Sequence, residues 1–237
     1  MNEAVEGGTL YIVSTPIGNL EDISLRAVRI LSGVDIVAAE DTRTTRVLLD
    51  HYAIRKPLIS YHSYNEARRT PELIAKLQSG LSVALVSDAG TPGISDPALR
   101  VISSALKAQI PVQPVPGASA FLPALIVSGL PTDRFTFEGF LPVRKGRRTK
   151  LERLRDEHQT IILYESPHRL LRTLRDLRDV VGDREIAVAR ELTKKFEEIV
   201  RGNIAEVLDH FSTHAIRGEF VLVIAANPSA RRPLTGE

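Results

Sequence analysis

Apolar runs and segments of helical periodicity alternate along the first half of the chain. The apolar runs are short and bounded by turn residues, which is typical of buried strands. They cover residues 10–14, 35–39, 57–60, 82–87 and 112–115. Between them, apolar residues recur every three to four positions at 25–31, 44–52, 65–78 and 97–108. This alternation predicts an α/β domain whose mostly parallel sheet has helices on its faces.

The pattern changes after residue 129. A helical segment of small residues at 117–128 is followed by the breaker cluster 129–133, and residues 134–140 then alternate with period two. We therefore expect an N-terminal domain at 1–129, a C-terminal α/β domain at 130–228 and a flexible tail at 229–237. The C-terminal domain is predicted to contain helices at 150–157, 167–180 and 204–211 and strands at 160–164, 185–190, 195–201 and 220–226. Because some of these strands follow one another without a helix, we expect a mixed sheet there.

Composition narrows the class of protein. Hydrophobic residues make up 43% and charged residues 25% of the chain, as in globular proteins, so nearly all of it is expected to fold. The chain has no cysteine, which excludes disulfides and thiolate metal sites and favours a reducing cytoplasm. No segment resembles a signal sequence or approaches the ~20 apolar residues of a membrane helix, so a soluble protein without a membrane partner is expected. The six histidines are scattered, and no metal is expected.

The positive charge is concentrated in one segment. The net charge is only +2, but residues 144–150 read Arg-Lys-Gly-Arg-Arg-Thr-Lys and contain no acid. Such a run can bind a phosphate backbone. It can equally be a solvated loop that enters a helix.

The most informative loop follows the strand at 82–87. Residues 87–97 read Ser-Asp-Ala-Gly-Thr-Pro-Gly-Ile-Ser-Asp-Pro. Open α/β sheets bind ligands at the carboxyl ends of their strands, and small residues let backbone groups approach the ligand. Asp88 and Asp96 suit a cationic ligand or ribose hydroxyls better than a phosphate. Alternatively, Asp96 caps a helix that begins at Pro97.

Two other strand ends are also followed by small or flexible residues. Residues 115–120 read Val-Pro-Gly-Ala-Ser-Ala, which leaves room either for a ligand or for close packing of a helix against a strand. Residues 14–22 contain Gly18 and Asn19, two residue types that permit a positive φ. That loop is compatible with a substrate site and with an ordinary βα turn.

Polar clusters follow three further strands. Residues 39–46 place Glu40 and Asp41 beside two arginines, which can bind and deprotonate a polar acceptor or can be a helix cap with exposed ion pairs. Residues 164–169 and 190–198 are polar runs in the second half. The sequence lacks the glycine motifs of dinucleotide-binding enzymes, P-loop NTPases and α/β-hydrolases. The pattern alone therefore predicts a two-domain α/β ligand-binding enzyme.

Six segments in this order resemble the RsmI-type family of small-subunit ribosomal RNA methyltransferases, within the tetrapyrrole methylase superfamily. The segments are 15–20, 39–43, 87–97, 116–120, 165–169 and 190–194. The resemblance implies two α/β domains with S-adenosylmethionine in the cleft between them, and a homodimer. It implies that the cofactor contacts are Pro16, Asp88, Ala89, Gly90, Ile94, Ser95, Ser119 and Ala120.

The implied substrate is the ribose 2'-hydroxyl of a cytidine in 16S ribosomal RNA near the decoding centre, within an assembled 30S particle. The methyl group and the acceptor oxygen must be positioned in line, and a base must remove or polarise the hydroxyl proton. The base candidates are Glu40, Asp41, Glu191 and a neutral Lys194. The residues expected to hold RNA phosphates are Arg43, Arg169 and Arg190, together with Arg144, Lys145, Arg147 and Arg148 of the basic run.

Two alternatives stay open at this point. The first is a methyltransferase of the same fold that acts on a tetrapyrrole or another small molecule, for which a wide apolar cleft is expected. The second is a nucleotide-binding regulatory module without catalysis, which would bind cofactor without turnover.

Overall fold

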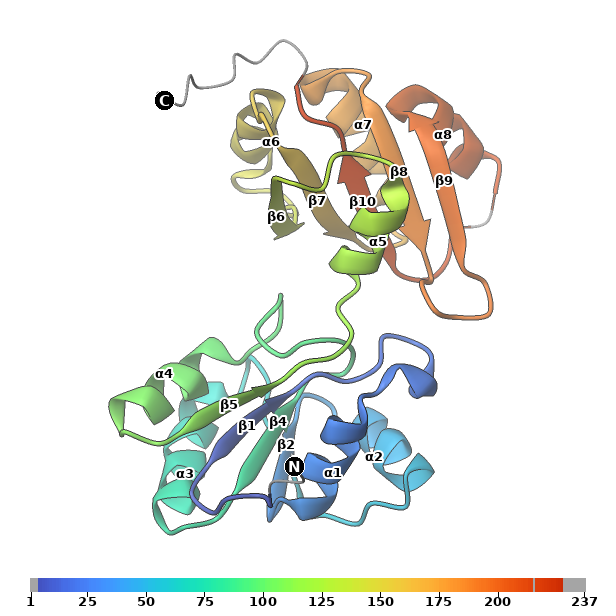
Figure 1. Ribbon diagram of the computed structural model, residues 1–237. Helices are drawn as coiled ribbons and strands as arrows, with labels where there is room; N and C mark the ends of the chain where they lie inside the picture. The colour runs from blue at the N-terminus through green and yellow to red at the C-terminus, as the bar shows by residue number, and fades with distance from the viewer. Residues whose placement is uncertain (1–3, 215, 228–237) are drawn as a thin grey trace, which may run out of the picture. The chain divides into compact units, whose positions relative to one another are not determined.

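The computed structural model describes residues 4–214 and 216–227, and the chain divides into two compact units between Ser119 and Ala120 (Figure 1). The boundary expected from the sequence, between residues 129 and 130, lies later in the chain. The difference arises from α5 (Phe121–Ser128), which contacts β7, β8 and β10 of the second unit. The predicted tail at 229–237 lies outside the described residues.

The first unit contains a five-stranded sheet with the strand order β3-β2-β4-β1-β5. All of its strand pairs are parallel. The strands are β1 (Leu10–Val13), β2 (Ile36–Ala39), β3 (Leu58–Ser60), β4 (Val83–Val86) and β5 (Val112–Val115). Strands β2 and β4 are buried at every residue, as their continuous apolar sequences require. Because the strands are parallel, the loops that follow them lie along one edge of the sheet.

Four helices cover the two faces of this sheet (Figure 1). One face packs against α1 (Leu25–Gly33) and α2 (Thr42–His51), and the other against α3 (Glu66–Gln78) and α4 (Leu99–Lys107). A single turn of 3-10 helix, η1 (Leu20–Asp22), precedes α1. The two apolar layers are separate hydrophobic clusters, because alternate residues of each strand point to opposite faces.

The second unit contains a mixed sheet with the strand order β6-β7-β10-β8-β9. Only β6 and β7 pair in parallel, and the other neighbours are antiparallel. The strands are β6 (Phe135–Phe140), β7 (Thr160–Glu165), β8 (Glu185–Arg190), β9 (Glu198–Asn203) and β10 (Phe220–Ile224). The predicted fold class, α/β with a parallel first sheet and a mixed second sheet, is therefore confirmed.

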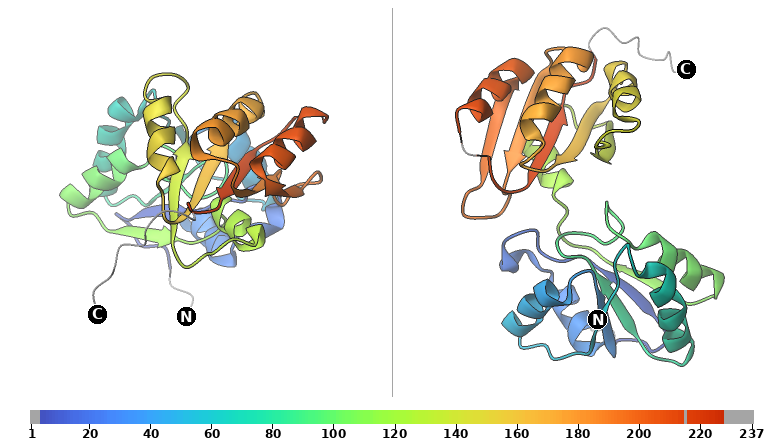
Figure 2. Two further views of the ribbon diagram at one scale, coloured as in Figure 1. Left: turned by 90° about the horizontal axis from the view of Figure 1, so that it is seen from above. Right: turned by 180° about the vertical axis from the view of Figure 1, so that it is seen from behind.

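Three helices form the main core of the second unit with one face of its sheet. They are α6 (Arg147–Arg155), α7 (Leu170–Val181) and α8 (Ile204–Ser212), and Figure 2 shows them on the same side of the sheet. Helix α5 lies on the opposite face. None of the helices among the described residues combines the length and apolar character needed to cross a membrane.

The observed ends of helices and strands differ most from the predicted ones where glycines and small residues interrupt the sequence pattern. Helix α6 begins at Arg147, three residues before the predicted start, because Gly146 adopts a left-handed conformation with φ of 80° and forms its N-cap. Helix α5 begins at Phe121, since residues 116–119 run as an irregular loop. Strand β9 begins at Glu198 after a turn, where Lys195 was predicted to be the first strand residue.

Candidate functional site

The loops that follow β1, β4 and β5 are tied together at the carboxyl edge of the first sheet. Thr15 and Gly90 exchange two backbone hydrogen bonds, with N···O distances of 2.8 and 3.1 Å. The hydroxyl oxygens of Ser14 and Thr91 lie 2.9 Å apart, and Thr91 Oγ1 donates to the carbonyl of Ala118 over 3.0 Å. Three segments that are distant in the sequence thus form one connected backbone platform.

Small residues are required where these loops approach one another. A Cβ atom at Gly117 would lie 2.8 Å from the Cβ of Ser14, a contact that folded proteins do not tolerate without movement. Gly90 has a φ of 87°, in the left-handed region that favours glycine. The short side chains predicted from the sequence therefore have a structural reason, and Ala89 and Gly117 are exposed at this edge.

Carboxylates from two loops gather at the same edge. The backbone N–H of Asp41, in the loop after β2, donates to Asp88 Oδ1 over 2.8 Å. Burial raises the pKa of Glu40, and the nearby Asp88 charge raises it further. Burial also raises the pKa of Asp96 to about 6, with repulsion from Glu40 and then from Asp88 added. Negative groups that raise one another's pKa in this way favour a cationic ligand.

Asp96 has a different position from the one expected of a helix cap. Helix α4 begins at Leu99 with Ala98 as its N-cap, and no side-chain cap hydrogen bond is present. Asp96 instead interacts with Ser87, Glu40 and Asp88. The sequence did contain a signal for this group, because each of these acids lies in a loop after a parallel strand, but a cap before Pro97 was an equally good interpretation.

The remaining predicted cofactor positions lie in the same loops. Ala89, Ile94 and Ser95 belong to the β4–α4 loop, and Pro16 is buried directly after the Thr15 bridge. Ser95 adopts a φ of 67°, which is uncommon for a residue other than glycine. Ser119 and Ala120 are half-buried at the end of the β5 loop. The first sheet therefore brings the predicted cofactor contacts that follow β1 and β4 to one edge, as its parallel topology requires.

The two acids after β2 are chemically different. Asp41 is the N-cap of α2, accepting from the backbone N–H of Arg43 at 2.8 Å, and its carboxylate pairs with the Arg43 guanidinium at 2.6 Å. The hydrogen bonds from Arg43 lower the pKa of Asp41 to about 2. Asp41 is therefore a weaker base than Glu40. Arg43, which was expected to hold an RNA phosphate, is exposed but paired with Asp41.

The candidate base Lys194 lies beside two carboxylates. Its ammonium group lies 3.0 Å from Glu191 Oε1 and 2.8 Å from Glu219 Oε2. Although burial lowers the pKa of Lys194, these carboxylates raise it by more, and the net pKa is above its ordinary value. The neutral amine needed for proton removal is therefore disfavoured at neutral pH. The pKa of Glu191 is lowered, against the opposing effect of its burial, by hydrogen bonds from Lys194 and the Glu219 backbone.

The basic run separates into exposed and buried residues. Arg144, Lys145 and Arg148 are exposed, whereas the side chain of Arg147 is only 5% exposed. Arg147 donates from Nε to Asp176 at 2.7 Å, from Nη2 to Thr173 at 2.8 Å and from Nη1 to the Pro142 carbonyl at 3.2 Å. Its assignment to RNA is wrong, because all three guanidinium nitrogens are used inside the protein.

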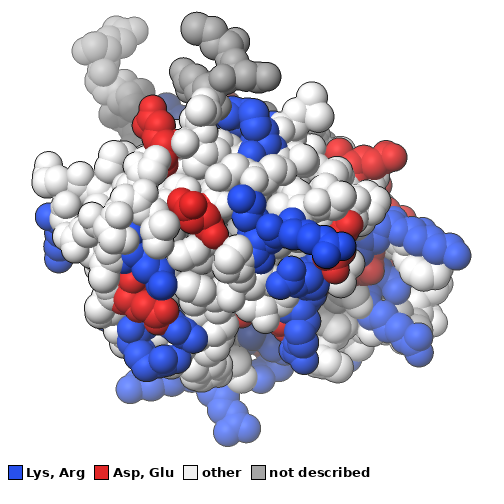
Figure 3. Space-filling model, turned by 90° about the horizontal axis from the view of Figure 1, so that it is seen from below, with Lys and Arg blue, Asp and Glu red and all other residues white. Residues whose placement is uncertain are grey.

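Arg169 and Arg190 are also largely occupied by internal partners. Arg169 pairs with the fully buried Glu165 at 3.1 Å and donates to the carbonyl of Leu141 at 2.5 Å. Arg190 pairs with Glu198 at 3.3 Å and donates to the carbonyl of Arg217. On the face shown in Figure 3, Lys and Arg side chains lie among Asp and Glu side chains and form no single unbroken patch.

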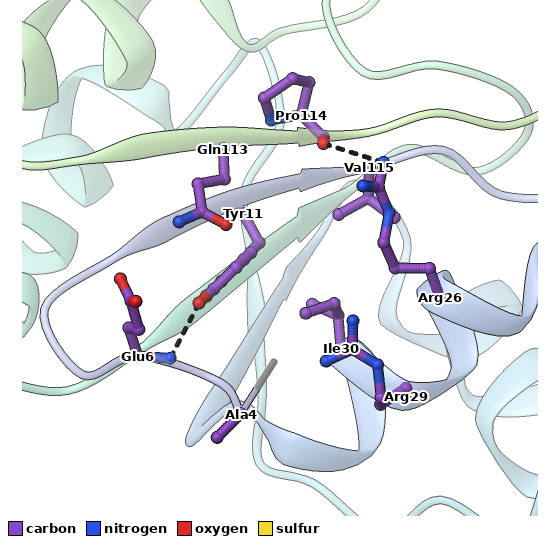
Figure 4. Close-up of a pocket in the computed structure, with 9 residues that line it drawn as sticks. All are labelled: Ala4, Glu6, Tyr11, Arg26, Arg29, Ile30, Gln113, Pro114 and Val115. Carbon is purple, nitrogen blue, oxygen red and sulfur yellow. Dashed lines mark hydrogen bonds between the residues drawn. The ribbon is translucent and has the colours of Figure 1, made fainter. Parts of the chain in front are cut away.

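A small polar pocket lies elsewhere in the first unit, between α1 and β5 (Figure 4). Arg26 crosses it and donates to the carbonyl of Pro114 over 3.4 Å, and the backbone N–H of Glu6 donates to the hydroxyl of Tyr11 over 2.9 Å. None of the residues predicted to bind the cofactor lines this pocket. It is therefore separate from the platform of loops.

Comparison with known proteins identifies the family. A model of the family described as Tetrapyrrole (Corrin/Porphyrin) Methylases matches residues 9–208. The chain is 53% identical to Ribosomal RNA small subunit methyltransferase I of a Synechocystis species over 97% of this chain and 83% of that protein. The chain belongs to the tetrapyrrole methylase family. A relative of the same name from Thermotoga maritima is 48% identical over 92% of this chain and 98% of its own length.

Solved structures of other tetrapyrrole methylase-like proteins share the fold. A diphthine synthase superposes with a TM-score of 0.74 at 14% identity, covering 92% of this chain and 90% of its own. Uroporphyrin-III C-methyl transferase from Thermus thermophilus, solved in complex with S-adenyl homocysteine, has a TM-score of 0.63 at 18% identity and covers 91% of this chain and 96% of its own. At these identities the similarity concerns the fold of this family member and not its substrate.

Proposed function

We propose that this protein is a cytoplasmic methyltransferase that uses S-adenosylmethionine to methylate the ribose 2'-hydroxyl of a cytidine in 16S ribosomal RNA, near the decoding centre of an assembled 30S particle. Two relatives with 53% and 48% identity, both named Ribosomal RNA small subunit methyltransferase I, support an RNA substrate. The observation that carries the proposal is the platform of small-residue loops with Glu40, Asp88 and Asp96 beside it.

The chain's own residues fit this cofactor. When bound, it supplies an electrophilic methyl group on a positively charged sulfur. Asp88, Asp96 and Glu40 provide negative charge at the platform, which suits that positive charge. Gly90 and the short side chains of the β4 and β5 loops allow backbone groups to hold the polar parts of the ligand. Glu40 is the residue best suited to accept the proton of the ribose hydroxyl.

The pH dependence of cofactor binding tests the role of Asp96. Since its pKa is about 6, Asp96 loses its proton as the pH rises from 5 to 7, and the platform becomes more negative. The dissociation constant for S-adenosylmethionine should therefore fall over this range. Calorimetric titration at several pH values measures it. The Asp96→Asn variant should show weaker binding at pH 7 and a shallower pH dependence, and equal profiles for the two proteins would contradict the assignment.

Salt dependence tests the exposed part of the basic run. Removing two phosphate contacts with the double change Arg144→Ala and Lys145→Ala should reduce the slope of log K against log salt by roughly 1.4 to 1.8. Binding to small ribosomal subunits at several salt concentrations measures this slope. The matched control is the double change Arg55→Ala and Lys107→Ala. Both side chains are exposed near the amino edge of the first sheet, Arg55 in the loop before β3 and Lys107 at the end of α4. Equal slopes in both variants would exclude a specific role of the run.

The homodimer stays a prediction as well. Helix α5 exposes Leu122 and Ile126, the latter to 71%, and such apolar groups are often covered in oligomers. We place the contact between copies on this side of α5.

Labelled methyl transfer is the experiment that tests the proposed reaction. The purified protein is incubated with labelled S-adenosylmethionine and small subunits from a strain that lacks it, and the modified nucleotide is mapped. A single ribose 2'-O-methyl group near the decoding centre is expected. Cofactor binding without any transfer to ribosomal RNA would contradict the proposal and favour a small-molecule acceptor such as a tetrapyrrole.

A further inference from the structure

Aromatic side chains form a continuous row in the second unit. Four of the seven phenylalanines take part, together with Tyr164. Phe121 contacts Phe135 and Phe137, with ring centroids 6.2 and 4.9 Å apart. Tyr164 contacts Phe137 and Phe140 edge to face, at 5.0 and 5.7 Å. The rings hold one another in place, so the row is a preorganised surface.

A β-bulge in the edge strand β6 creates this row. Pairing with β7 shifts between Phe137 and Gly139, so that Phe137 lies opposite Ile162 and Phe140 opposite Tyr164. Without the extra residue Glu138, Phe140 would point to the other face of the sheet, where α6 and α7 pack. Gly139 has a φ of 60°, which accommodates the irregular backbone. The bulge therefore directs a third phenylalanine of β6 to the same face.

Both ends of the row are accessible. Phe140 is 51% exposed and Phe135 is 36% exposed, whereas Phe121, Phe137 and Tyr164 are partly covered. The two exposed rings are separated by four strand positions, roughly 13 Å at the usual rise of a strand. Exposed aromatic rings that neighbouring rings hold in place are suited to stacking with planar groups.

Charge around the row favours a polyanion. Arg134 immediately precedes β6, and Arg144 and Lys145 follow it, and all three are exposed. The one acid within the strand, Glu138, is paired with Lys150. Cations beside exposed aromatic rings are the combination with which proteins bind single-stranded nucleic acids, because phosphates and bases are held at the same time.

We propose that this aromatic row, Phe135 to Phe140 with Phe121 and Tyr164, is a stacking platform for unpaired bases of the RNA substrate. The inference rests on the proposed function and extends it to how the RNA is held. Phe140 and Phe135 stack with unpaired bases of the RNA strand, while Arg134, Arg144 and Lys145 hold the adjoining phosphates. Stacking is tolerant of sequence, so the row positions the RNA strand and does not select the target base.

The test compares Phe140→Ala with Phe196→Ala, since Phe196 is another exposed phenylalanine, 67% exposed and outside the row. Binding to a fluorescent 12-nucleotide single-stranded RNA is measured at several salt concentrations. Phe140→Ala should weaken binding roughly 5- to 140-fold, the range of one lost base–aromatic stack. The salt slope should stay unchanged because no cation is removed. Phe196→Ala should bind like the unmodified protein.

Two further variants separate stacking from general apolar contact. Phe140→Trp keeps an aromatic face and should restore binding, whereas Phe140→Leu keeps only apolar volume and should not. The inference would be overturned if Phe140→Ala bound RNA with unchanged affinity or if Phe140→Leu bound it with full affinity. It would also be overturned if Phe140→Ala converted a dimer to a monomer in sedimentation, because the row would then be an interface between copies. If the unmodified protein transfers methyl groups to small subunits but Phe140→Ala binds RNA equally well, the inference fails and the proposed function stands. If the unmodified protein neither binds nor methylates RNA, both fail.

Discussion

Replacing Glu40 by glutamine should lower kcat roughly 10²- to 10⁴-fold, the usual contribution of a general base. Glu40 follows β2 and is partly buried, and its raised pKa makes its carboxylate a better proton acceptor than an ordinary carboxylate. Glutamine has nearly the same shape but accepts no proton. The loss should therefore appear in kcat more than in the dissociation constant for the cofactor. Single-turnover methyl transfer to small subunits, with a parallel cofactor titration, measures both.

The other candidate bases provide the controls for this experiment. Asparagine also caps helices, so Asp41→Asn keeps the N-cap of α2. Because the pKa of Asp41 is about 2, Asp41 is a poor base, and Asp41→Asn should lower the rate much less than Glu40→Gln does. Lys194→Met should not mimic Glu40→Gln, because the raised pKa of Lys194 keeps it charged. If Glu40, Asp41, Glu191 and Lys194 could each be replaced with less than about threefold loss, positioning of the hydroxyl alone would account for the rate.

The pH–rate profile gives an independent test of the same assignment. A general base must be deprotonated, so kcat, measured with saturating cofactor and RNA to remove the effect of Asp96 on binding, should rise with pH until the raised pKa of Glu40 is passed and then level off. This rise should be lost in Glu40→Gln. A profile that is the same in both proteins would mean that another group titrates.

The parallel sheet and its loops could be predicted from the sequence because each strand is short, apolar and followed by small or acidic residues. Strand β4 and the loop that contains Asp88 are an example, since a fully buried parallel strand reads as one apolar run. The position of Asp96 could not be predicted in this way. Whether an acid caps a helix or faces other acids depends on where the helix begins, and element ends are the least certain part of a pattern.

The sequence could also not distinguish the members of the basic run. Arg144, Lys145, Arg147 and Arg148 look equivalent in the chain, yet the left-handed Gly146 starts α6 at Arg147 and turns that side chain inward. The aromatic row escaped prediction for a related reason. Its members lie on α5, β6 and β7, and a bulge changes the face to which Phe140 points.

Replacing Arg147 by alanine should lower the free energy of unfolding by about 1 to 3 kcal/mol, the usual cost of leaving buried hydrogen-bonding groups without their partner. Its guanidinium binds Asp176 and Thr173, and the Thr173 hydroxyl in turn donates to Glu165 Oε2 over 2.6 Å. The Glu165 side chain is fully buried. The change would remove the donor to the buried Thr173 hydroxyl and to the Pro142 carbonyl, while the partly exposed Asp176 keeps Arg172 at 3.7 Å.

The neighbouring Arg148→Ala variant is the matched control, because it removes the same charge from the same basic run. The side chain of Arg148 is 88% exposed and pairs only at the surface with Glu152, so its loss should cost less than about 1 kcal/mol. Urea denaturation followed by circular dichroism compares the two. Arg147→Lys should be intermediate, since an ammonium keeps the charge but cannot reach three partners with a planar fork. Equal denaturation midpoints for Arg147→Ala and Arg148→Ala would show that the network contributes no stability, and the inward orientation of Arg147 would then need another explanation.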